Sequence, residues 1–182
     1  MQSNMLGCLK EMDFNKATIT ITFSDKIDSD SVHRFIDKLE QLNNAHPDCS
    51  QLVINISSSG GDIDTAVELF NFIKSLDCHV RIVNTSYVNS AAIIVFLAGD
   101  ERICLPTSSF YVHSVTKRLD GIYNAGSLMR EVREINANTD KIATLLESTT
   151  KKNKAYWKRL MRKGQMLSAE KALEVGLTTT EQ

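Results

Sequence analysis

The sequence predicts an α/β fold built around a parallel β-sheet, and three observations lead to this prediction. Short segments rich in β-branched residues alternate with segments whose apolar residues recur at helical spacing. This alternation is typical of βαβ units with right-handed crossovers. Small polar residues and glycines gather at two strand-to-helix junctions, around Gly60 and around Ser90. Because ligands bind at the carboxyl ends of parallel strands, we expect both junctions to face one site.

The first two strands and the first helix follow directly from the pattern. Ala17–Phe23 alternates apolar and hydroxyl side chains, as a strand does. Ser29-Asp30-Ser31 is expected to cap a helix that places five apolar residues on one face, namely Val32, Phe35, Ile36, Leu39 and Leu42. Gln51–Ser57 is expected to form the second strand, ending in the Ser/Gly cluster.

A second helix is predicted from Asp62, with Ile63, Ala66, Val67, Phe70 and Ile73 facing inward. His79–Thr85 is predicted to be a third strand that leads to Ser90. The run Ala91–Ala98 after Ser90 is apolar throughout, which indicates a buried helix.

The second half of the chain contains short strands and a long helix. Arg102–Leu105 and Ser109–Val112 are predicted strands, and Asn124 to Thr150 is predicted to be a mostly polar helix. That helix is longer than a small core needs, so we expect it to project and to contact a partner subunit. Ser168 is expected to cap a last helix, Ala169–Val175, which Gly176 closes.

Composition excludes several classes of function. The 182 residues fit one domain, 1–182, of which Met1–Lys16 is poorly patterned and does not resemble a signal peptide. A net charge of −1 with mixed signs gives no reason to expect nucleic acid, and Ala91–Ala98 is too short to cross a membrane. The four cysteines are scattered, which argues against a disulfide framework and a zinc site. We therefore expect a cytoplasmic protein with no metal and no cofactor.

Serine and cysteine side chains at three places in the chain could carry nucleophilic chemistry. A hydroxyl at Ser90 would lie at a helix N-terminus, whose free amides could hold an oxyanion; the structural alternative is a simple N-cap serine. Cys104 lies in a strand-like run and is better explained as a buried, inert thiol. Ser57, Ser58 and Ser59 are typical turn formers.

His113 and Gly60-Gly61 are the other candidates. The glycine pair lacks the spacing of a nucleotide-binding loop, so it predicts either a tight turn or an exposed backbone N–H. His113 ends a strand, and a catalytic role for it is supported only if the fold brings it close to Ser90.

Taken in order, these motifs resemble the ClpP family of serine peptidases. The resemblance rests on Ser-Ser-Gly-Gly after a strand, Asn-Ser-Ala-Ala before an apolar helix, Leu-Pro-Thr-Ser followed by His113, the long helix, and Leu-Ser-Ala-Glu-Lys-Ala near the C-terminus. It covers roughly Ile19 to Thr178. It implies a crotonase-like ββα superhelix with a long handle helix, and heptameric rings stacked through that helix. It also implies a polypeptide substrate and an AAA+ unfoldase partner, although Met1–Lys16 does not match the family's axial-pore loop.

Carried over by position, the resemblance assigns Ser90 as the nucleophile and His113 as the general base. The backbone N–H groups of Gly61 and Ala91 match the oxyanion hole. The place of the family's catalytic aspartate is filled by Gly164, and no carboxylate lies between Ser148 and Glu170.

The sequence therefore predicts a serine endopeptidase with a Ser-His site that lacks the usual aspartate. Two alternatives stay open: a weakly active or inactive ring subunit with a structural role, and a crotonase-type enzyme that acts on acyl-thioesters.

Overall fold

The computed structural model describes residues 18–180 and contains a six-stranded sheet in the order β1-β2-β3-β5-β6, with β4 paired to β3. Strands β1 (Thr18–Phe23), β2 (Gln51–Ser58) and β3 (His79–Asn89) run parallel. The predicted α/β class is confirmed. Met1–Lys16 lies outside the described residues.

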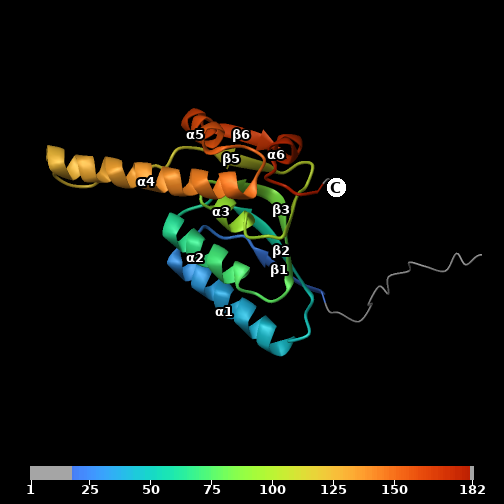
Figure 1. Cartoon of the computed structure of the whole chain (residues 1–182). Coiled ribbons are helices and arrows are strands. Elements are labelled where there is room, and N and C mark those ends of the chain that lie inside the picture. The colour runs from blue at the N-terminus through green and yellow to red at the C-terminus, as the bar shows by residue number, and fades with distance from the viewer. Residues whose placement is uncertain (1–17, 181–182) are drawn as a thin grey trace, which may run out of the picture.

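Two helices cover one face of this parallel sheet, α1 (Ser29–Ala45) and α2 (Ile63–Lys74) (Figure 1). Alternate strand residues such as Ile54 and Ile82 are fully buried beneath them. The predicted cap of α1 is wrong by a few positions. Asp28 is the N-cap, and Ser31 sits at the third helical position, where each side chain bonds the other's backbone N–H in a capping box.

Strand β3 is four residues longer than its hydrophobic pattern predicts. Its first half pairs with β4 (Glu101–Cys104), and its last residues, from Tyr87, pair with β5 (Ser109–Val112). The extension carries the chain directly to Ser90, and the apolar run after it forms only a short helix, α3 (Ala92–Phe96).

The basic segment after residue 150, whose run of charge is typical of a solvated helix face, contains a helix and also a strand that the sequence analysis did not predict. Helix α5 (Lys154–Lys163) buries Trp157 and Met161 against the rest of the protein and exposes its arginines. Gly164 then reverses the chain into β6 (Gln165–Ser168), which pairs antiparallel with β5, so the sheet is mixed. The last helix, α6 (Ala169–Val175), has the predicted Ser168 N-cap and Gly176 at its end.

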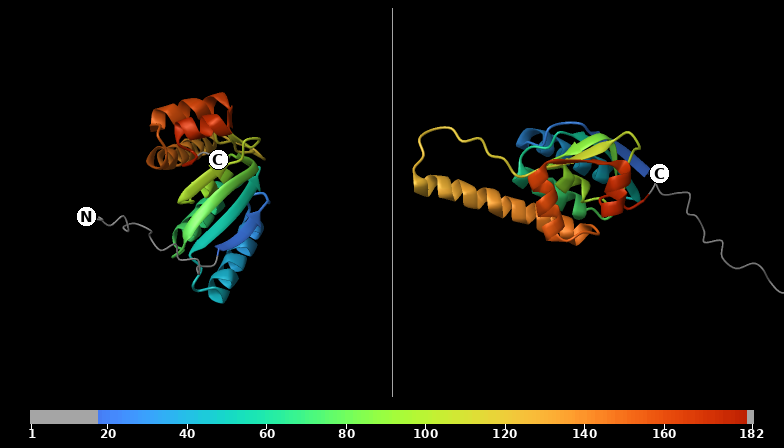
Figure 2. Two further views of the ribbon diagram at one scale, coloured as in Figure 1. Left: turned by 90° about the vertical axis from the view of Figure 1, so that its right-hand side faces the viewer. Right: turned by 90° about the horizontal axis from the view of Figure 1, so that it is seen from above.

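Helix α4 (Ala125–Thr149) is long and projects from the body, as predicted (Figure 1). Seen from above, its first half and the preceding loop extend well beyond the sheet (Figure 2). Its buried residues, Ala143 and Leu146, both lie in the second half. No helix within residues 18–180 is long and apolar enough to cross a membrane.

Candidate active site

The carboxyl ends of β2, β3 and β5 bring the predicted site residues together. Asn89 of β3 pairs with Tyr111 of β5, and the Ser90 N–H donates to the Tyr111 carbonyl at 2.9 Å. Ser90 and His113 therefore follow the ends of neighbouring parallel strands. Both residues and Gly61 line one cavity of about 80 Å³.

Ser90 occupies a strained turn between strand β3 and helix α3. Its φ of 54° is the one positive φ of a non-glycine residue within 18–180. Such a backbone conformation costs on the order of 1–3 kcal/mol and is often found at functional sites. Helix α3 has Ala91 as its N-cap and no side-chain capping bond. The N-cap alternative for Ser90 is thus wrong, and the turn resembles a nucleophile elbow, which exposes a serine hydroxyl at the end of a sheet.

Gly60 allows the β2 turn to pack directly against this elbow. With a φ of 86°, a Cβ atom at this position would lie 2.5 Å from the Asn89 carbonyl oxygen and 2.8 Å from the Ser90 Cβ. No side chain fits in that contact. The glycine pair is therefore required by a close approach of two backbones.

Gly61 presents its N–H on the side away from Ile27. The Ile27 N–H donates to the Gly60 carbonyl at 3.0 Å, and the Asp62 N–H donates to the Ile27 carbonyl at 2.9 Å. In this parallel bridge the N–H of the central residue, Gly61, points the other way. A Cβ on Gly61 would lie 2.0 Å from the Ile27 oxygen, so this position also requires glycine.

A second amide, that of Ala91, opens the first turn of α3. A Cβ on Gly60 would lie 3.0 Å from this nitrogen, which shows how closely the two turns approach. Within residues 18–180, neither the Gly61 nor the Ala91 N–H donates a hydrogen bond to the protein. The structure thus leaves both predicted oxyanion donors available.

The His113 ring is held by two neighbours. Its Nδ1 lies 2.7 Å from the Ser114 carbonyl oxygen, and this contact requires Nδ1–H as the donor. The ring stacks on Tyr111 with centroids 5.1 Å apart and an interplanar angle of 23°. Among the described residues, no hydrogen bond joins His113 to the Ser90 hydroxyl. Catalytic pairs are often loosely aligned without substrate.

The position where the resemblance implies an aspartate, Gly164, lies next to the end of the β5–β6 pairing. That pairing ends at Val112 and Gln165, so His113 and Gly164 are the next residues along the two strands. Gly164 has a φ of 63° and ends α5. A Cβ there would lie 3.0 Å from the Tyr111 hydroxyl oxygen. Tyr111, which the sequence analysis did not single out, fills this space.

Cys104 takes no part in this cavity. It is buried, and burial raises the pKa of its thiol to about 11, so the reactive thiolate is disfavoured. The predicted inert thiol agrees with this environment. The part of the chain described by the structure also holds no group of three side chains suited to a metal ion.

Comparison with known proteins supports the resemblance inferred from the motifs. The family model for Clp protease matches residues 9–180. An ATP-dependent Clp protease proteolytic subunit 3 from Rhizobium johnstonii is 25% identical over 153 residues, covering 72% of this chain and 73% of its own length. An ATP-dependent Clp protease proteolytic subunit 2 from Treponema pallidum is 27% identical over 150 residues, covering 76% of this chain and 68% of its own length.

A solved structure shows the same fold. A point mutant of ClpP1 from Listeria monocytogenes superposes with a TM-score of 0.76 at 22% identity, covering 87% of this chain and 88% of that one. The architecture therefore matches the ClpP fold that the resemblance implies. Since the family model spans nearly the whole sequence, the chain belongs to the Clp protease family.

Proposed function

We propose that this protein is a serine endopeptidase that cleaves short or unfolded polypeptides by acyl transfer. The observation that supports it most is the meeting of Ser90, His113 and the Gly61 amide at one cavity. The Ser90 hydroxyl attacks the scissile carbonyl while His113 Nε2 takes its proton. His113 then protonates the leaving amine, and water hydrolyses the acyl-enzyme by the same route.

The Gly61 and Ala91 N–H groups stabilise the oxyanion in this mechanism. Each such donor is worth roughly 3 kcal/mol of barrier in serine peptidases. Both donors are backbone groups held by glycine contacts and by a helix end, so they need no reorganisation when charge develops.

Gly164 favours one alternative, a ring subunit with low turnover and a mainly structural role. Loss of the triad carboxylate costs about four orders of magnitude in a serine protease template, largely because the histidine takes the wrong tautomer. Here the Ser114 carbonyl accepts from Nδ1, which leaves Nε2 free to act as the base. This contact supports an active site over an inactive one.

The cavity walls predict the substrate preference. Apart from the catalytic candidates and Thr116, the lining side chains are apolar, namely Ile63, Ile93, Val112, Val115, Ile142, Leu146 and Met161. An acidic side chain would be desolvated there without a partner. We expect fluorogenic peptides with leucine or methionine before the cleaved bond to be hydrolysed at least about ten times faster than those with aspartate.

The same assay tests the proposed activity. Hydrolysis of the apolar peptides by the purified protein, abolished by a fluorophosphonate, is the expected result. Turnover of coenzyme A thioesters with no amide hydrolysis would instead support the crotonase-type alternative, and the absence of both would support the structural subunit.

We also propose that α4 joins copies of this chain. Its projecting half exposes Leu128, Met129 and Val132, which are 43%, 54% and 49% accessible. Leu128 and Val132 are four residues apart and share a helix face. The relatives are named as proteolytic subunits, which fits an assembly. The heptameric ring, an AAA+ unfoldase partner and the cytoplasmic location stay predictions.

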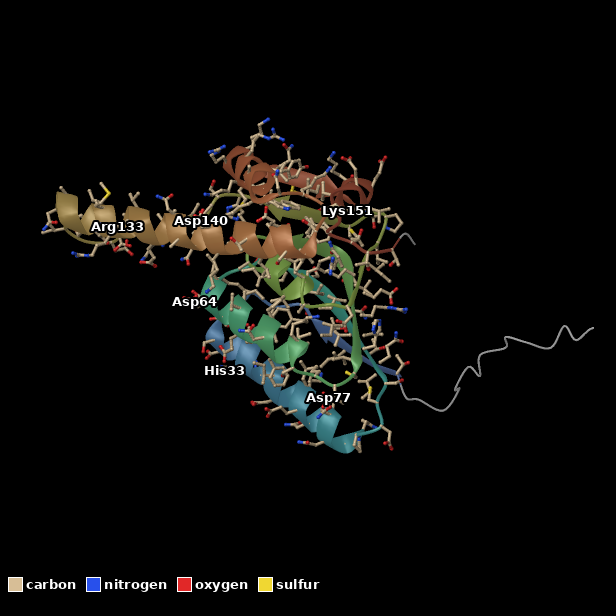
Figure 3. The ribbon with its side chains drawn as sticks, in the orientation of Figure 1. His33, Asp64, Asp77, Arg133, Asp140 and Lys151 are labelled. Carbon is tan, nitrogen blue, oxygen red and sulfur yellow. The ribbon has the colours of Figure 1, made fainter. Side chains whose placement is uncertain are left out.

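Glutamates at Leu128 and Val132 should disrupt this contact. We expect light scattering to give the double variant no more than about half the molecular mass of the wild-type assembly, because a carboxylate is unfavourable in an apolar interface. Arg133→Ala, on the same projecting half (Figure 3), is the control and should keep the wild-type mass. Unchanged mass in the double variant would exclude this surface.

A further inference from the structure

We propose that Tyr111 and the Ser114 carbonyl position His113, in place of the carboxylate that Gly164 lacks. The proposal rests on the proposed function of Ser90 and His113 as nucleophile and base. Tyr111 is a positioning residue, since its ring contacts the histidine and it is not among the residues that line the cavity.

Tyr111 contacts both halves of the proposed catalytic pair. Its backbone carbonyl accepts the Ser90 N–H at 2.9 Å and thereby fixes the strained turn. Its ring stacks on the His113 imidazole at 5.1 Å. Tyr111 lies in β5 and His113 directly follows this strand, and the interplanar angle of 23° means that the two rings lie nearly parallel. One residue therefore sets the relative position of hydroxyl and imidazole.

Gly164 makes the space for this arrangement. Gly164 lies two residues before Met166, the residue of β6 that pairs with Tyr111, and its backbone is left-handed with a φ of 63°. A Cβ at position 164 would lie 3.0 Å from the Tyr111 hydroxyl oxygen and 3.7 Å from the ring carbon that carries it. A side chain here would require the phenol to shift by a few tenths of an ångström, and the positive φ also favours glycine. Glycine at this position therefore lets the Tyr111 ring stay where it is.

The Ser114 carbonyl supplies the hydrogen bond that orients the ring. It accepts from His113 Nδ1 at 2.7 Å. The Ser114 hydroxyl donates to the Met161 carbonyl at 3.2 Å, which ties this loop to the last turn of α5. A carbonyl fixes the tautomer as a carboxylate does, but it offers no full negative charge to the imidazolium. In this site the Ser114 carbonyl can therefore fix the tautomer of His113, but it does not stabilise the charge of the imidazolium as a carboxylate would.

The first test is independent of activity. The full chain is labelled with ¹⁵N-histidine, and its ring nitrogens are observed by NMR at a pH where the rings are neutral. Loss of one spin system in His113→Gln assigns the signal among the four histidines. We expect His113 to carry its proton on Nδ1. A proton on Nε2, or rapid exchange between the two nitrogens, would overturn the proposal.

The second test uses Tyr111 variants in the peptide assay. Tyr111→Phe keeps the stacked ring and should change kcat by less than threefold. Tyr111→Leu removes the ring and should lower kcat at least tenfold, with KM within twofold and with the Nδ1–H signal weakened. Retained kcat and an unchanged NMR signal in Tyr111→Leu would overturn the positioning role. Rescue by phenylalanine separates this role from a general loss of folding.

The Ser114→Ala variant tests whether the hydrogen bond from the Ser114 hydroxyl to Met161 holds the Ser114 carbonyl in place. Ser148→Ala is its matched control, since the Ser148 hydroxyl also donates to a helical carbonyl but is exposed and distant in sequence. We expect only Ser114→Ala to weaken the Nδ1–H signal, and equal signals in both variants would contradict the anchor. The wild type could fail to cleave peptides while the His113 tautomer still depends on Tyr111. In that case the proposed function is wrong, and the role of Tyr111 in positioning His113 stands.

Discussion

Replacement of Ser90 with alanine is expected to lower kcat for peptide hydrolysis by at least about three orders of magnitude, because the covalent step loses its nucleophile. The fold should be unaffected. Within residues 18–180 the Ser90 hydroxyl makes no hydrogen bond to the protein, and alanine leaves the backbone turn as it is. The measurement is steady-state hydrolysis of an apolar peptide, with a thermal melt of the same preparation.

Ser86→Ala is the matched control for this variant. Ser86 is an exposed serine of strand β3, four residues before Ser90, which follows the end of this strand. It should keep wild-type kcat. Equal activity of Ser90→Ala and wild type would show that another group attacks the peptide, and the proposed mechanism would be wrong.

Replacement of Arg102 with methionine is expected to lower the free energy of unfolding by about 4 kcal/mol, since several buried carbonyls lose a charged donor. Arg102 is only 8% exposed. Its Nε donates to the Leu177 carbonyl at 2.7 Å and its Nη1 to the Gly99 carbonyl at 3.2 Å. Its Nη2 donates to the carbonyls of Thr149 and Gly176 at 3.0 and 3.3 Å. Burial lowers the pKa of this guanidinium.

These bonds hold together the ends of three helices. Gly99 follows α3, Thr149 ends α4, and Gly176 follows α6. Urea unfolding should therefore show a large loss in Arg102→Met. Arg81→Met, which removes a partly exposed pair with Glu101, should cost no more than about 1 kcal/mol. Similar losses in the two variants would mean that the buried network contributes little.

The site was largely predictable because it lies at strand ends. Parallel strands place their carboxyl ends together, so the junctions at Gly61 and Ser90 could be expected to meet once the strands were recognised. The approach of His113 was implied only by the family resemblance, because spacing along the chain does not give the order of the strands in the sheet. The strands themselves follow from alternation, as in Thr18–Phe23. Helix α4 follows from its long amphipathic pattern and from Asn124, which is its N-cap.

Other features depend on contacts that no local pattern contains. In α5 the basic residues outnumber the two buried anchors, Trp157 and Met161, so the segment resembles a solvated surface. Strand β6 buries only Leu167, and its pairing partner β5 is more than fifty residues earlier in the chain. The α1 cap was misplaced because Asp28, Ser29 and Asp30 are all good capping residues.

The role of Tyr111 could not be predicted from sequence for the same reason. Its stacking on His113 and its contact with Gly164 join three positions through tertiary structure. The resemblance implied only that Gly164 stands where the family has an aspartate. The structure shows which side chain lies beside that gap.

The most direct test of the account is to map the residue that a fluorophosphonate modifies in the purified protein. Tandem mass spectrometry of the digested adduct should find the label on Ser90, and His113→Gln should slow labelling strongly, because the hydroxyl loses its base. A label on another serine, or equally fast labelling of Ser90 without His113, would contradict the proposed nucleophile and base.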